Sequence, residues 1–82
     1  MMAGTPTTIT GHIVVQLVPG TRGGMVQPYE RTLFTSDSPI MSSALDAVPA
    51  LVRRHGYGQY QIHRTYSDGA RTKHFECVLI DS

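Results

Sequence analysis

Residues 59–80 read QYQIHRTYSDGARTKHFECVLI, in which two β-rich runs flank the segment Ser67-Asp68-Gly69-Ala70. An Asp-Gly pair between runs of alternating polar and apolar residues is typical of a tight β-hairpin. We therefore predict two antiparallel strands joined by a two-residue turn, with Asp68 and Gly69 both at positive φ.

This turn predicts the register of the hairpin. The expected cross-strand pairs are Tyr66 with Arg71, Arg64 with Lys73, Ile62 with Phe75, and Tyr60 with Cys77. A three-residue loop with Gly69 alone at positive φ would slip the register by one residue and place Ile62 opposite His74. The hydrophobic pattern favours the two-residue turn, because one face then carries the apolar residues Tyr60, Ile62, Phe75, Cys77 and Leu79.

Two further strands are expected near the N-terminus. Ile9 to Val18 is rich in β-branched residues and partly apolar on both faces, which favours a central strand. We expect its main core face to carry Ile13, Val15 and Leu17. Pro19-Gly20 ends this strand, a glycine-rich loop follows, and Tyr29 to Phe34 forms the reliable part of the second strand.

A helical pattern occupies the middle of the chain. Apolar residues recur at three- and four-residue spacings at Met41, Ala44, Leu45, Val48, Leu51 and Val52. Two starts are open, a Ser38 cap followed by Pro39 or a Ser43 cap with Asp46 three residues later.

The same segment contains Pro49, which either kinks one helix or lies in the first turn of a shorter one. The C-terminal end of the helix is clearer, because Arg53, Arg54 and His55 complement the helix dipole there. Gly56 suits the left-handed position that follows the helix.

The element order is therefore β, β, α, β, β. It predicts an α+β fold, a four-stranded antiparallel sheet with one helix packed on one face. Residues 1–8 read as a flexible lead-in without a secretory signal, and residues 9–82 as a single small domain.

Composition limits the class of protein. The 82 residues are 40% hydrophobic and 16% charged, with a net charge of +1 and no long apolar run, so neither a membrane span nor wholesale disorder is expected. The single cysteine, Cys77, excludes an internal disulfide and fits a reducing compartment. We expect a cytoplasmic protein, with Cys77 acting as a small buried hydrophobe.

No pattern indicates catalysis. His63 and His74 are cross-strand neighbours in the expected register, yet spacing supplies no third or fourth metal ligand and Cys77 points to the opposite face. The chain also lacks a nucleophile elbow and a phosphate-binding loop ending in Gly-Lys-Ser/Thr. We therefore expect no enzyme activity, no bound metal and no cofactor.

Basic and aromatic residues gather near the hairpin turn. In the expected register they share one face and form a rim suited to binding phosphate or stacking on a base. The rim comprises Arg64, Tyr66, Arg71 and Lys73, with Arg53 and Arg54 as further candidates. A solvated hairpin tip is the alternative interpretation.

A second candidate surface is apolar. It comprises residues on faces opposite the main core of their strands, namely Val14, Val18, Val78 and Ile80. With a helix on one side of the sheet only, a protein partner, a second copy or the N-terminal segment would have to cover them.

Size, element order and the uncovered sheet face make residues 9–80 resemble the small inhibitors that phages and mobile elements use against bacterial defence, including some anti-CRISPR proteins. The resemblance implies a non-catalytic protein-binding module that inhibits a host defence complex in the host cytoplasm. Two alternatives stay open: a nucleic-acid-binding module that uses the basic rim, and a structural homodimer subunit.

Overall fold

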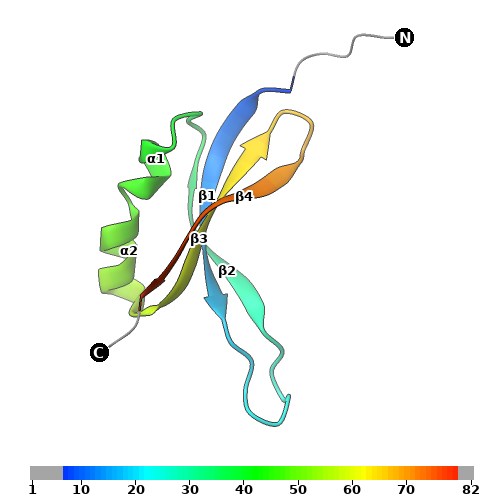
Figure 1. Cartoon of the computed structure of the whole chain (residues 1–82), viewed down its shortest axis with the longest axis vertical. Helices are drawn as coiled ribbons and strands as arrows, with labels where there is room; N and C mark the ends of the chain where they lie inside the picture. Colours follow the sequence, from blue (N-terminus) through cyan, green and yellow to red (C-terminus); the bar gives the residue numbers. More distant parts are fainter. Residues whose placement is uncertain (1–6, 80–82) are drawn as a thin grey trace.

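The computed structural model describes residues 7–79. Its strands are β1 (Ile9–Val18), β2 (Tyr29–Ser36), β3 (Gly58–Tyr66) and β4 (Arg71–Leu79), and its helices are α1 (Ser42–Leu45) and α2 (Val48–His55). The strands form one antiparallel sheet in the order β2-β1-β3-β4. Both helices lie on one side of this sheet, so the predicted α+β architecture is confirmed (Figure 1).

The helical segment divides between Leu45 and Val48, just before Pro49. A continuous helix would need the residue 49 N–H to donate to the Leu45 carbonyl, which proline cannot do. Instead α1 ends at Leu45, and Pro49 lies in the first turn of α2, where a missing donor costs nothing. Of the two alternatives that the sequence left open for Pro49, the structure adopts the shorter second helix.

The helix ends match the expectation at one end only. At the C-terminal end, Gly56 has φ +87°, and the basic residues Arg53, Arg54 and His55 occupy the last turn. At the N-terminal end, no side chain caps α1; the Ser38 hydroxyl accepts a hydrogen bond from the Ile40 N–H, before the helix begins.

The core lies between the helices and the centre of the sheet. Val14 of β1 pairs with Ile62 of β3, and both are buried against Ala44 and Val48 of the helices. The expected core face of β1 was therefore wrong. The β1–β3 register places Val14, rather than Val15, on the same face as Ile62, and only that face is covered by α1 and α2.

The β3–β4 turn also differs from the prediction. The Tyr66 N–H donates to the Ala70 carbonyl and the Gly69 N–H to the Tyr66 carbonyl, each at 3.0 Å, so the loop has three residues. Within this loop only Gly69 has positive φ, at +88°, and Asp68 does not. The Asp68 side chain favours this arrangement by accepting a hydrogen bond from the Ala70 N–H at 2.9 Å.

A β-bulge compensates for the longer loop. Near the turn, Thr65 pairs with Arg71 and His63 with Lys73, one residue out of the expected register. The register shifts between Ile62 and His63, leaving His74 as the extra residue on β4. Beyond the bulge, the predicted pairs Ile62–Phe75 and Tyr60–Cys77 are confirmed.

Candidate functional site

The sheet face opposite α1 and α2 is the main candidate for a functional surface, and we call it the open face. Along β1 it carries Ile13, Val15 and Leu17, whose partners on β3 are His63, Gln61 and Gln59. Val15 is fully buried although no helix covers it. The open face is therefore folded over on itself rather than flat.

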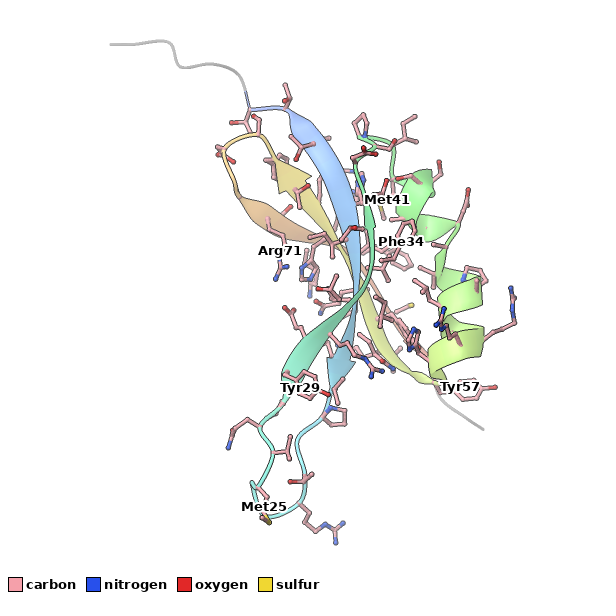
Figure 2. All side chains as sticks on the ribbon, turned by 180° about the vertical axis from the view of Figure 1, so that it is seen from behind. Met25, Tyr29, Phe34, Met41, Tyr57 and Arg71 are labelled. Carbon is pink, nitrogen blue, oxygen red and sulfur yellow. The ribbon has the colours of Figure 1, made fainter. Side chains whose placement is uncertain are left out.

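An ion pair joins the two edge strands across the open face. Arg71 of β4 and Glu30 of β2 lie on opposite edges of the sheet, yet the Arg71 Nη2 is 3.1 Å from the Glu30 Oε1. Each edge strand has a bulge, at Leu33 in β2 and at His74 in β4, and bulges increase local twist. Figure 2 shows Arg71 on the side of the sheet away from the helices. Because both side chains are about half exposed, the pair itself contributes at most about 1 kcal/mol.

A hydrogen-bonded network lies beneath this ion pair. The His63 Nε2 is 2.8 Å from the Gln61 Oε1, and the Gln61 Nε2 donates to the Glu76 Oε2 at 2.7 Å. Gln59 donates to the same carboxylate oxygen. Since Gln61 uses its amide nitrogen as the donor to Glu76, its carbonyl oxygen must accept a hydrogen bond from the His63 Nε2–H.

His63 is consequently a buried, neutral histidine. Its side chain is 8% exposed, and its Nδ1 has no hydrogen-bond partner within the described residues. Burial lowers the pKa of His63, the nearby Arg71 and Lys73 lower this pKa further, and Glu30 opposes them. Hydrogen bonds from Gln61 and Gln59 lower the pKa of Glu76 and keep it an acceptor.

We expect the stability of the fold to depend on His63 in mildly acidic solution. Because the folded-state pKa lies below the ordinary value of 6.5, the unfolded chain binds the proton more readily. The contribution of neutral His63 is full above about pH 6.5, and it is lost as the pH falls toward the folded-state pKa. Urea unfolding at several pH values between about 7.5 and 5 should show this decline.

The matched pair His63→Gln and His74→Gln isolates the effect. The first variant removes the buried titrating ring, so its unfolding free energy should depend less on pH than that of the parent. The second replaces an exposed histidine and should retain the parent pH dependence. Equal pH dependence in the parent and the His63→Gln variant would rule out this role for His63.

At one end of the sheet the surface is apolar on both faces, because Leu17 and Val78 lie on the open face and Val18 lies on the helix side. An open groove of about 930 Å³ lies where β1 ends and β2 begins, beside the α2–β3 connection. It is lined by Leu17, Val18, Pro19, Gly20, Pro28, Tyr29, Glu30, Tyr57, Gly58, Gln59 and Val78, and we call it the groove. Tyr29, Tyr57 and Val78 are 49%, 60% and 59% exposed, which leaves a mostly apolar surface in contact with solvent.

Two tyrosines stand at the sides of the groove. Tyr29 begins β2 directly after Pro28, and Tyr57 lies between Gly56 and Gly58 in the short connection from α2 to β3. In Figure 2 they appear on the two sides of the lower end of the sheet, above the hairpin that carries Met25. An open, aromatic and apolar groove with a few polar groups suits another polypeptide better than a small polar substrate.

The predicted basic rim is not assembled. The bulge after Ile62 moves Arg71 and Lys73 to the open face, where they pair with Glu30 and Glu76. Arg64 instead lies on the helix side and donates to the buried His12 at 3.2 Å. The prediction of one shared face was therefore wrong for Arg64, Tyr66, Arg71 and Lys73, because that prediction depended on a two-residue turn. Arg53 and Arg54 are exposed at the end of α2.

The predicted apolar surface is partly present. The prediction of Val14 as an interface residue was wrong, since Val14 is fully buried beneath the helices. Val18 and Val78 both line the groove. Ile80 lies outside the described residues. Of the residues that line the groove, the sequence prediction included only Val18 and Val78. Tyr29 and Tyr57, which it missed, have one sequence signal, an aromatic residue beside Pro or Gly at an element boundary.

The structure also bears on the His63–His74 pair and on the expected burial of Cys77. His63 faces Lys73 instead of His74, and residues 7–79 contain no group of three or more His, Cys, Asp or Glu placed to hold a metal ion. Cys77 packs against the core, and burial raises the pKa of its thiol.

Comparisons with known proteins add nothing to this geometry. No family model matches the chain, and no curated protein or solved structure is significantly similar to it. Neither of the helices that the structure describes is long and apolar enough to cross a membrane.

Proposed function

We propose that this chain is a non-catalytic protein-binding module whose working surface is the groove at the apolar end of the sheet. The observation that carries the proposal is the exposure of Tyr29, Tyr57 and Val78 around one open, apolar groove. Aromatic residues clustered in a desolvated pocket are typical anchors of protein interfaces.

The location of the groove supports this role. It is built by the ends of all four strands and by the short α2–β3 connection, so its walls are supported by the folded core. A preorganised wall reduces the entropic cost of binding, which is an advantage for a small module. Inhibition of a bacterial defence complex, expected from size and element order, is the narrower form of this proposal.

The nucleic-acid alternative has less support from the geometry. Arg71 and Lys73 are engaged with carboxylates, and Arg64 lies on the other side of the sheet. Phosphate binding at the turn would therefore have to break existing ion pairs, whereas protein binding at the groove would not.

A capture experiment tests the proposal. Tagged protein is incubated with nuclease-treated bacterial lysate, and the retained proteins are quantified by mass spectrometry. We expect a stoichiometric protein partner, and Val78→Asp should reduce its capture about tenfold by placing a charge in the apolar groove. Val78 is largely exposed, so the variant should unfold at nearly the same temperature as the parent.

Ile40→Asp is the matched control. Ile40 is an exposed aliphatic residue, 63% exposed, that does not line the groove, and its replacement should leave capture unchanged. If both variants lost the same amount of captured partner, the groove would not be the binding surface. Recovery of nothing but nuclease-sensitive material from untreated lysate would favour the nucleic-acid alternative.

A further inference from the structure

One residue of the groove reaches the buried histidine of the open face. Glu30 lines the groove, and its carboxylate lies between two partners, with Oε1 3.1 Å from the Arg71 Nη2 and Oε2 3.9 Å from the His63 Nε2. Glu30 is also the one charged residue among the described residues that line the groove. A change in the charge of the His63 ring therefore acts directly on the carboxylate of the groove.

A second path joins His63 to the groove through side-chain amides. The His63 Nε2–H donates to the Gln61 Oε1 at 2.8 Å. The Gln61 and Gln59 amide groups both donate to the Glu76 Oε2. Gln59 itself lines the groove. His63 is thus connected to the β2 side of the groove by Glu30 and to the β3 side by Gln59.

The surroundings of His63 do not suit a charged ring. Its side chain is 8% exposed, and a proton taken up by the ring would go to Nδ1, a buried atom with no hydrogen-bond partner within the described residues. A buried cation with an unpaired N–H is costly, so protonation requires a change in the groups around the ring.

The groups that face His63 determine which change follows. β1 presents apolar side chains to this part of the open face. The charged side chains around the ring are Glu30 from β2 and Arg71, Lys73 and Glu76 from β4, the last reached through Gln61. Glu30 is the one carboxylate among them that approaches the ring without an intervening side chain. A protonated His63 therefore draws Glu30 toward itself and weakens the contact of Glu30 with Arg71.

We propose that His63 is a pH-sensitive switch for the groove: the groove keeps its binding shape while the ring is neutral, and proton uptake rearranges it through Glu30 and Gln59. This inference rests on the proposed function, because it adds regulation to that same surface. Proton binding and partner binding then oppose each other, so mildly acidic solution should release a protein held in the groove.

Nuclear magnetic resonance spectroscopy of the free protein tests the coupling without a partner. Proton–nitrogen correlation spectra and the ring signals of the four histidines are recorded between about pH 7.5 and 5. We expect the backbone amides of Tyr29, Gln59 and Val78 to shift with one common midpoint. This midpoint should equal that of the His63 ring.

Glutamine variants assign the shift to one histidine. His63→Gln should abolish the common transition. His55→Gln and His74→Gln are matched controls and should retain it, since His55 ends α2 beside the groove residue Tyr57 and His74 is the extra residue of the β4 bulge. Glu30→Gln should move the His63 midpoint to lower pH, because Glu30 raises the pKa of His63 against the larger effect of burial.

Captured partner gives the functional measurement. Lowering the pH from about 7.5 to about 5.5 should reduce capture by the parent about fivefold, and capture by His63→Gln should fall much less. The His74→Gln control should lose capture as the parent does. Equal losses in the parent and His63→Gln would overturn the regulation of binding by His63.

The spectra also separate this inference from the proposed function. The inference is overturned if the groove amides follow another histidine, keep their transition in His63→Gln, or show none before the parent unfolds. Capture at about pH 7.5 that still depends on Val78 would then leave the binding module intact. Groove amides that follow His63 in a protein that captures no partner would support the coupling and remove the binding module.

Discussion

Replacing Ile62 with alanine should lower the free energy of unfolding by about 3 kcal/mol. The Ile62 side chain is 1% exposed and belongs to the cluster that joins the sheet to α1 and α2. It also lies between Val14 of β1 and Phe75 of β4 in the ladder, so the smaller side chain leaves a cavity that three strands border. Urea unfolding monitored by circular dichroism measures the change.

Ile40→Ala provides the same chemical change without burial. Ile40 is 63% exposed, so its replacement should alter the unfolding free energy by no more than about 0.5 kcal/mol. For a domain of this size, the Ile62 variant should lose about 12 to 24 °C in melting temperature. Similar losses in the two variants would mean that the core is not centred on Ile62.

Replacing Gly11 with alanine should cost about 3 kcal/mol for a different reason. A Cβ atom at this position would overlap the Ser36 carbonyl oxygen and lie 3.2 Å from the Asp37 Cα. Both are backbone atoms, so neither can move aside as a flexible side chain does. Relief requires separating β1 from the end of β2, which weakens the ladder between them.

Gly23→Ala distinguishes steric exclusion from the general cost of replacing glycine. Gly23 has φ +90°, but a Cβ atom at this position would meet no other atom within 4 Å, so strain alone should cost about 1 kcal/mol. Thermal unfolding of the two variants side by side gives the comparison. If Gly11→Ala were no more costly than Gly23→Ala, the close approach of β1 to Ser36 would not exist in solution.

The open face combines two different environments. Its polar part holds the buried His63 beneath the Arg71–Glu30 ion pair, and its other end, at Leu17 and Val78, forms part of the groove. Gln59 belongs to both, because it lines the groove and donates to Glu76 in the network. The proposed binding surface is therefore joined through the exposed Gln59–Glu76 hydrogen bond to a network that ends at the buried His63.

Local patterns were sufficient to predict the elements of the fold. Glycine at position 56 after three basic residues marked the end of α2, and alternating residues marked the β3–β4 hairpin. The pairs Ile62–Phe75 and Tyr60–Cys77 followed from the need to bury one apolar face. These features depend on neighbours in the sequence or across one hairpin, which is why the sequence alone determined them.

Three features were decided only by the tertiary structure. An Asp-Gly pair is compatible with both two- and three-residue loops, and the choice depended on whether a bulge at His74 restores the core register. Because the loop has three residues, Arg64 and Arg71 lie on opposite faces of the sheet, so the predicted basic rim does not form. Both faces of β1 are apolar, so only its pairing with β3 could select Val14 for the core. The groove combines the ends of β1 and β2 with Tyr57 and Val78, residues that only the folded sheet brings together.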